Sequence, residues 1–258
     1  MITLKSLLPA TFGAAILLAV LPSSFAADNT FKVGTDPDYR PISYSDPSGK
    51  LIGVDADFAA DLAKHMGKSL NYEGIAWEGI IPALQAGKID AITNLVVTDK
   101  RKETVAFSEP YLAQTVTTVV PANKPDLNPS LEALKGLRVG VMVNTAAAGV
   151  VAKVAGANAT TYNTVADEYS DLLLGRLDAV AIESINAYYT TKAMYDGKLR
   201  VTGVPLSDSK QLIAVAMRKD NAALIAEVNK GIEAMRSDGS LDGIAKKWFG
   251  DTAIIAKP

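Results

Sequence analysis

The chain has 258 residues, a formal net charge of −2 at pH 7, one histidine and no cysteine. The near-neutral charge argues against a nucleic-acid or anionic-membrane binder. The missing thiols exclude disulfides and cysteine-ligated zinc. Since His65 is the sole histidine, a histidine-rich metal site is excluded, as is a Ser-His-Asp triad without that residue. We expect no metal and no cofactor.

Residues 1–26 are predicted to be a cleaved signal peptide. Lys5 makes the start basic, residues 7–21 form a short apolar stretch, and Ser24-Phe25-Ala26 offers small residues for cleavage after about Ala26. The alternative, a membrane anchor, needs a longer apolar stretch. With no cysteine after this stretch, a lipid anchor is not available. We expect an exported, periplasmic protein.

The remaining chain alternates strand and helix patterns. Residues 31–35 predict a strand, and the prolines of the loop 36–41 disfavour a helix there. Apolar residues from Val54 to Met66 recur at helical spacing, which places His65 on the outer surface of a helix. Further strands are expected at 69–75, 91–97, 115–120, 137–143, 178–182 and 212–217, with helices at 77–86, 131–134, 167–174 and 221–236 and after Thr98 and Asn144. This alternation predicts an α/β protein with parallel sheets, arranged as two lobes.

One phrase occurs twice in the chain. Leu-Gln-Ala-Gly-Lys-Ile-Asp-Ala-Ile begins at Leu84, and Leu-Leu-Leu-Gly-Arg-Leu-Asp-Ala-Val begins at Leu172. Each copy is typical of a helix end, a glycine cap and a buried strand. Because binding groups in open α/β sheets follow the carboxyl ends of strands, Thr93-Asn94 and Ile182-Glu183 become the first site candidates.

Several ordered motifs together resemble one known family. They are Gly34-Thr35-Asp36-Pro37-Asp38-Tyr39-Arg40-Pro41, the segments 49–57 and 77–91, Thr98-x-x-Arg101, Phe107-Ser108-Glu109-Pro110-Tyr111 and Lys247-Trp248-Phe249-Gly250. The chain is similar to the periplasmic solute-binding proteins of amino-acid ABC importers, family 3. The resemblance implies a two-lobed periplasmic binding protein fold of type II, each lobe a mainly parallel sheet flanked by helices. Lobe 1 would comprise 27–112 and 213–258, lobe 2 would comprise 116–209, and a two-stranded hinge would cross near 113–115 and 210–212.

The resemblance implies that an amino acid binds between the lobes as they close. Arg101 matches the residue that binds the ligand carboxylate, a role that suits the planar guanidinium. The alternative is a surface ion pair with Asp99 or Glu103. Glu183 stands where the family places the acid that binds the ligand ammonium, usually an aspartate. Its alternative role is to cap the next helix.

Other positions match residues that surround the ligand in relatives. Thr93, Asn94 and Val96 match polar contacts, although Val96 replaces a common Ser or Thr and the strand is one residue shorter. Thr145 and Ala146 follow Asn144 where the family has Gly-Thr-Thr, and helix amides there attract a carboxylate. Asp36, Tyr39 and Trp77 match the side-chain pocket, where Asp36 favours a cationic ligand. The alternative for Trp77 is packing between elements.

The primary hypothesis is therefore a monomeric binding protein that delivers a polar, possibly cationic, amino acid to ABC transporter permease subunits. One alternative is an enzyme resembling the cyclohexadienyl dehydratases. These share the fold and use a glutamate three residues beyond the ammonium-binding acid. Here that position is Asn186, which has no acidic proton to give. Another alternative is a sensory role, which the sequence does not separate from transport.

Overall fold

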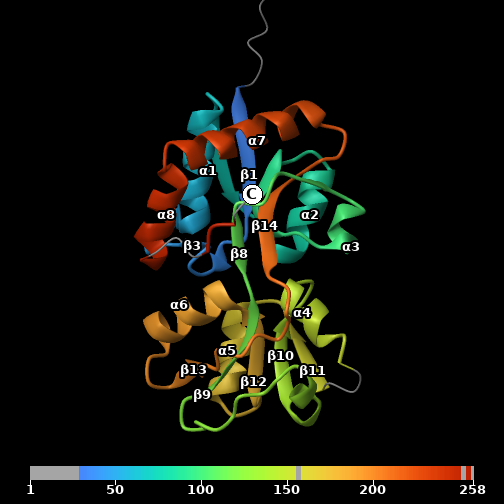
Figure 1. The fold of residues 1–258 in the computed structure, drawn as a ribbon, viewed down its shortest axis with the longest axis vertical. Helices are drawn as coiled ribbons and strands as arrows, with labels where there is room; N and C mark the ends of the chain where they lie inside the picture. The colour runs from blue at the N-terminus through green and yellow to red at the C-terminus, as the bar shows by residue number, and fades with distance from the viewer. Residues whose placement is uncertain (1–28, 155–157, 251–253, 257–258) are drawn as a thin grey trace, which may run out of the picture.

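The computed structural model describes residues 29–154, 158–250 and 254–256. They form two larger sheets, one above the other in Figure 1, and a small sheet of three short strands. None of the helices among these residues has the length and apolar character needed to cross a membrane. The predicted signal peptide, residues 1–26, lies outside the described residues.

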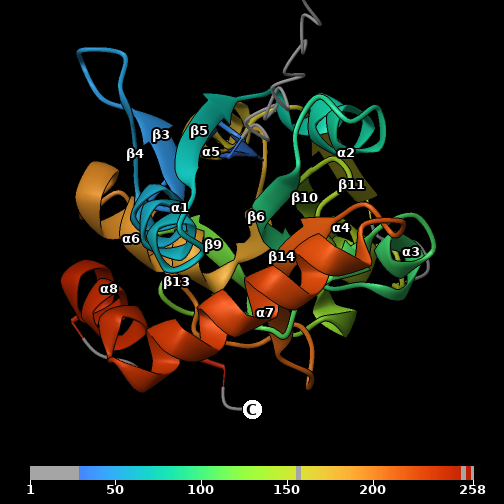
Figure 2. The ribbon, with the colours of Figure 1, turned by 90° about the horizontal axis from the view of Figure 1, so that it is seen from above.

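The first sheet has the strand order β5-β1-β6-β14-β7, and β8 also pairs with β14. Helices α1, α7 and α8 cover one face, and α2 and α3 lie on the other side (Figure 2). The strands are β1 (Thr30–Thr35), β5 (Ser69–Gly74), β6 (Ala91–Val96), β7 (Ala106–Phe107), β8 (Leu112–Gln114) and β14 (Gln211–Met217). The helices are α1 (Val54–His65), α2 (Trp77–Gln85), α3 (Asp99–Lys102), α7 (Ala222–Ser237) and α8 (Ser240–Phe249).

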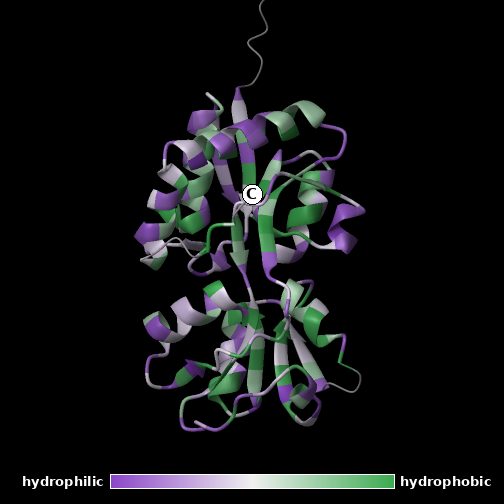
Figure 3. Cartoon of the chain, in the orientation of Figure 1, coloured by the Kyte–Doolittle hydropathy of each residue, from purple (hydrophilic) through white to green (hydrophobic). Residues whose placement is uncertain are grey.

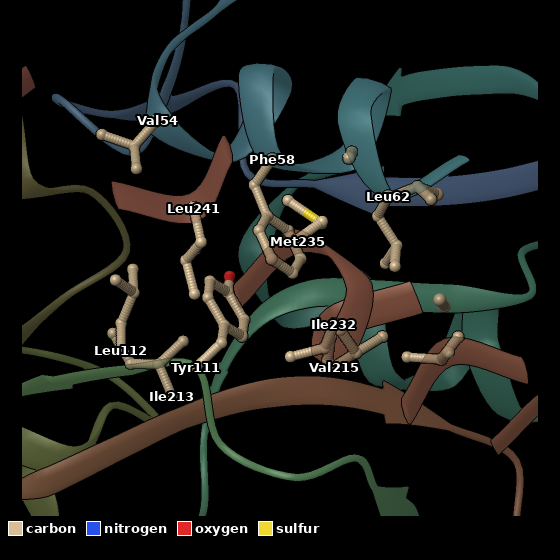
Figure 4. Packing of buried hydrophobic residues seen from close by; sticks show 14 of the residues in the cluster. Val54, Phe58, Leu62, Tyr111, Leu112, Ile213, Val215, Ile232, Met235 and Leu241 are labelled. Atoms are coloured by element: carbon tan, nitrogen blue, oxygen red, sulfur yellow. The ribbon is translucent and has the colours of Figure 1, made fainter. Parts of the chain in front are cut away.

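Aromatic stacking holds α1 against this sheet. Phe58 of α1 lies on the ring of Tyr111, with ring centroids 3.8 Å apart and planes 7° from parallel (Figure 4). The hydroxyl of Tyr111 donates to the carbonyl of Thr93, 2.6 Å away, so this buried phenol has a partner. The predicted apolar stripe of α1, with Val54, Phe58 and Leu62, therefore faces the core.

The second sheet has the order β11-β10-β12-β9-β13. Its strands are β9 (Val116–Pro121), β10 (Arg138–Met142), β11 (Asn158–Tyr162), β12 (Ala179–Glu183) and β13 (Leu199–Val201). Helices α4 (Ala146–Val151), α5 (Val165–Leu173) and α6 (Ser184–Met194) and the 3-10 helix η1 (Glu132–Gly136) accompany it. The strands of both sheets are largely hydrophobic, whereas the helices carry both kinds of residue (Figure 3). This pattern places a separate core around each sheet.

The expectation of mainly parallel sheets is confirmed, with one strand in each sheet running against the others. Parallel pairing joins β5, β1 and β6 in one sheet and β11, β10 and β12 in the other, while β14 and β9 pair antiparallel with their neighbours. The reason is topological. The chain passes between the sheets through β8 into β9 and returns into β14, and β9 and β14 run against the parallel set of their sheets (Figure 1). The predicted hinge segments, 113–115 and 210–212, lie on these two crossings, and the division into lobes stays a prediction.

The small sheet is a loop-borne feature that the sequence pattern did not indicate. It consists of β2 (Asp38–Tyr39), β3 (Ser43–Ser45) and β4 (Leu51–Ile52), paired antiparallel. Pairing of β2 with β3 gives the loop 36–41 a defined backbone path. It thereby presents Tyr39 at the edge of the first sheet.

The repeated phrase builds the same turn twice. Gly87 and Gly175 both have φ of +71°, the left-handed conformation that glycine adopts without steric cost. Two residues further on, Ile89 and Leu177 are buried. The aspartate that follows then bonds the first residues of the neighbouring parallel strand: Asp90 accepts from the amide of Lys32 and Asp178 from that of Arg138. Each copy thus ends one helix and fixes the register of the next strand.

His65 is half-buried rather than fully at the surface as expected, because it bridges two elements. Its Nδ1 lies 2.8 Å from the carbonyl oxygen of Asp61, and its Nε2 lies 2.8 Å from Oδ2 of Asp238, which follows α7. These two oxygens raise the pKa of His65. A charged imidazole donates to both of them.

We expect His65→Gln to lower the melting temperature slightly at acidic pH, with the difference shrinking at alkaline pH. A raised folded-state pKa stabilises the protein below the pKa of the unfolded histidine, and this stabilisation disappears as the pH rises through the folded value. Thermal unfolding of both proteins across the pH range checks this. A difference that grows with pH would contradict it.

Candidate functional site

A cavity lies between the two larger sheets. It has a volume of about 570 Å³, including the solvent at its mouth. Its lining comes from both sheets and from the loops at their facing edges. The lining residues are Thr35, Asp36, Tyr39, Ile42, Trp77, Ile80, Ile92, Asn94, Val96, Arg101, Gln114, Met142, Thr145, Ala146 and Glu183.

Arg101 is the buried cation of this cavity. Thr98 caps α3 by accepting the amide of Arg101, which fixes the start of the side chain. Its Nη1 donates to the carbonyl of Val96 over 2.8 Å, and its Nη2 donates to the carbonyl of Asn144, also over 2.8 Å. Burial lowers the pKa of Arg101, and the nearby Glu183 raises it. No ion pair with Asp99 or Glu103 is present, so the surface alternative does not describe this arginine.

Trp77 stands beside Arg101 and also contacts the second sheet. The guanidinium carbon lies 5.3 Å from the centroid of its ring, within the range of a cation–π contact. Its Nε1 donates to the carbonyl of Val143 over 3.0 Å. Trp77 therefore lines the cavity and packs between the sheets at the same time.

Glu183 ends β12 at the opposite wall. Its Oε2 accepts the hydroxyl of Tyr39 over 2.7 Å, and its Oε1 accepts the amide of Ala147 over 3.1 Å. Thr145 caps α4 by accepting the amide of Ala148 over 3.1 Å. Glu183 therefore takes one of the first free amides of α4, where the sequence predicted a site for a ligand carboxylate. It makes no side-chain cap for its own helix, α6.

The strand β6 presents alternate residues to the cavity. Ile92, Asn94 and Val96 line it, because residues two apart share one face of a strand. Thr93 is fully buried and does not line the cavity, so the structure places it on the other face of the strand. Every other predicted site residue lies on the lining.

The acidic groups of the cavity outnumber the basic ones. Asp36 lines it, and burial raises the pKa of Asp36 although the amide of Asp38 donates to its Oδ1. Glu183 and Asp36 therefore face one buried cation, Arg101. Among the described residues, no group of three or more histidine, cysteine, aspartate or glutamate side chains is placed to hold a metal ion.

Sequence reasoning missed Thr35, Gln114 and most of the apolar part of the lining. The signal for Ile92 was its position two residues before Asn94, and Ile80 lies on the buried stripe of α2. Gln114 lies on the first crossing between the sheets and is nearly buried. Nothing in the sequence marked Gln114, since its role depends on which segments cross.

A fourth polar link, besides those made by Tyr39, Arg101 and Trp77, joins the two halves beside the cavity. The amide of Asn186 donates to the carbonyl of Arg40 over 2.7 Å, and its oxygen accepts the hydroxyl of Tyr169 over 3.1 Å. Together with the Tyr39–Glu183 and Arg101–Asn144 bonds, it holds the facing edges in contact. The two halves are therefore in contact around the cavity.

Two sheets joined by short crossings, with a cavity lined by charged, polar and apolar side chains between them, define a two-lobed binding protein of the type whose lobes close over a ligand. Residues 31–251 match the model of the bacterial extracellular solute-binding proteins, family 3. The chain belongs to this family.

Curated relatives and solved structures agree with that membership. The L-cystine-binding protein TcyJ of Escherichia coli K12 is 34% identical over 223 residues, which cover 86% of this chain and 83% of the relative. The lysine/arginine/ornithine-binding periplasmic protein of the same strain is 34% identical, covering 90% and 92%. The solved structure of an ancestral arginine-binding protein bound to arginine aligns with a TM-score of 0.80 at 35% identity, covering 86% and 99%.

Proposed function

We propose that this solute-binding protein captures a cationic amino acid in the cleft and delivers it to the permease subunits of an ABC importer in the periplasm. One observation supports this most: the lining of the cavity carries one cation, Arg101, and two acidic groups, Asp36 and Glu183. A ligand carboxylate neutralises Arg101, and its ammonium neutralises Glu183. The charge of Asp36 then remains unpaired, and a cationic group on the ligand side chain would neutralise it.

The roles of the ligand-contacting residues follow from their chemistry. The guanidinium of Arg101 suits both oxygens of a carboxylate, and Trp77 holds it from one side. Asn94 and Thr145 offer uncharged polar contacts. Tyr39 holds Glu183 in place until the ligand ammonium replaces its hydroxyl. The names of the relatives support an amino-acid ligand, and several are named for arginine or lysine.

We further propose that the cleft binds without changing its ligand. The dehydratase alternative needs an acid at position 186, and the amide of Asn186 carries no acidic proton. Both ends of the Asn186 amide are also engaged in hydrogen bonds, the nitrogen with the carbonyl of Arg40 and the oxygen with the hydroxyl of Tyr169. A protein that closes over its ligand and releases it chemically unchanged suits delivery to a transporter. We propose that it does so as a monomer.

Thermal unfolding with single amino acids tests the ligand class. We expect L-arginine, L-lysine, L-ornithine or L-histidine to raise the melting temperature more than L-glutamate or L-leucine, because a ligand that binds the folded form alone stabilises it. L-cystine belongs in the same screen, since one relative is named for it. A shift with L-glutamate alone would overturn the cationic class.

A further inference from the structure

A buried acid lies behind Glu183 and takes no part in the lining. Glu168 of α5 has 0% of its surface exposed. It lies on the helix stripe formed by Val165, Tyr169 and Leu172, which faces the core of the second sheet. Tyr39 and Trp77, from across the cleft, pack against this core. Glu168 therefore lies in the core of the second sheet, against which the cavity-lining residues Tyr39 and Trp77 also pack.

Neither carboxyl oxygen of Glu168 has a hydrogen-bond partner within the part of the chain that the structure describes. This differs from Glu183, whose two oxygens both accept hydrogen bonds. An ionised carboxylate buried without a partner is very costly, and such a group keeps its proton instead. Burial and the charge of Glu183 raise the pKa of Glu168 well above its usual value.

The groups around Glu168 add no positive charge. The titratable groups that interact electrostatically with Glu168 are Glu183 on β12, Tyr39 on β2, Tyr162 on β11 and Tyr169 on its own helix. Strands β9 and β10 also pack on α5. β9 carries no titratable side chain, and Arg138 of β10 is paired with Asp178 at 2.9 Å. Arg101 already interacts with Glu183, and a ligand ammonium held by Glu183 would add a further positive charge on the side of Glu168.

We propose that Glu168 couples ligand binding to a proton: it holds the proton in the ligand-free protein and releases it to solvent when a cationic amino acid binds at Glu183. Glu168 is then a positioning residue that acts through Glu183 and Tyr39, without touching the ligand. This inference rests on the proposed function, since it needs a cation in the cleft.

The sign of the coupling is fixed by the charges. A cation near a carboxyl group favours its ionised form, so the bound protein holds fewer protons than the free protein. By linkage, the affinity must then rise with pH, by up to about tenfold per pH unit while one proton is released. Glutamine at this position keeps the shape of the neutral acid and has no proton to lose.

Titration calorimetry with L-arginine tests the coupling directly. We expect the wild type to release protons on binding, seen as heats that differ between phosphate and Tris buffers, and to bind more tightly at about pH 8 than at about pH 5.5. Glu168→Gln should bind equally well at the lower pH, with less proton release and a flatter pH profile. Identical proton counts and pH profiles in the two proteins would overturn the proposal.

A second measurement needs no ligand. A carboxyl group that keeps its proton only when folded makes the protein less stable as the pH rises above the unfolded value. We therefore expect Glu168→Gln to raise the melting temperature at about pH 8 and to change it little at about pH 4. Glu132→Gln, which removes an exposed acid paired with Lys135, is the matched control.

The two measurements separate the proposals. If the wild type binds none of L-arginine, L-lysine, L-ornithine and L-histidine, the cationic ligand class and the coupling that rests on it both fail. The ligand-free measurement still decides whether Glu168 holds a proton. A melting difference between the wild type and Glu168→Gln that is independent of pH shows that it does not, whatever the cleft binds.

Discussion

Arg101→Met should abolish amino-acid binding while leaving the protein folded. The guanidinium is the one basic group on the cavity lining among the described residues, and methionine keeps much of its length without charge or donors. Removing one partner of a buried, hydrogen-bonded charge pair costs about 2–5 kcal/mol. At about 1.4 kcal/mol per factor of ten, the affinity should fall at least about 30-fold and by as much as several thousand-fold.

Titration calorimetry of the variant with L-arginine measures this loss. Arg101→Lys keeps the charge without the planar pair of donors, so it should recover only part of the affinity. Arg218→Met is the matched control, because Arg218 directly follows β14 near Gly87 and does not line the cavity. Near-normal affinity in Arg101→Met, with normal binding by the control, would refute the assignment of the ligand carboxylate to Arg101.

Gly53→Ala should destabilise the protein more than alanine substitution of any exposed loop glycine, since Gly53 is buried. Gly53 precedes α1 with φ of +139° and ψ of −179°, a region open to glycine almost alone. An added Cβ would lie 2.2 Å from the carbonyl oxygen of Ile42, which must move. That movement breaks the bonds from the amides of Val54 and Asp55 to Pro41 and Ile42.

Backbone strain of about 1–3 kcal/mol and two hydrogen bonds of about 1 kcal/mol each give an expected loss of about 3–5 kcal/mol. Unfolding by urea measures it. Gly49→Ala is the control, because Gly49 has φ of +84° and nothing within 4 Å of an added Cβ. It should lose only about 1 kcal/mol, from strain alone. Equal losses in both variants would show that contact with Ile42 contributes nothing.

The sequence predicted the alternating part of the fold well because its signals are local. The repeated glycine, buried residue and aspartate each act within a few positions, and both copies form the expected turn. The antiparallel strands were not predicted, because the direction of β14 depends on where the chain crosses between sheets. The small sheet of β2, β3 and β4 was missed since each strand has only two or three residues.

The candidate site shows the same division. Nine of the ten predicted residues line the cavity, and period-two alternation along β6 could have excluded Thr93. Glu168 was overlooked because a helical glutamate is usually exposed. A signal was nevertheless available: Glu168 lies with Val165, Tyr169 and Leu172 on the single apolar stripe of α5.

If the cleft binds an amino acid as proposed, we expect the hydrogen bond between Tyr39 and Glu183 to select which ligands bind there. A molecule that offers only a hydroxyl to Glu183 gains nothing over the tyrosine already there, 2.7 Å away. An ammonium offers a full charge and up to three donors, and charge-assisted bonds are about twice as strong as neutral ones. We therefore expect hydroxy acids and water to bind Glu183 no better than the hydroxyl of Tyr39 does. Amino compounds should bind it more strongly.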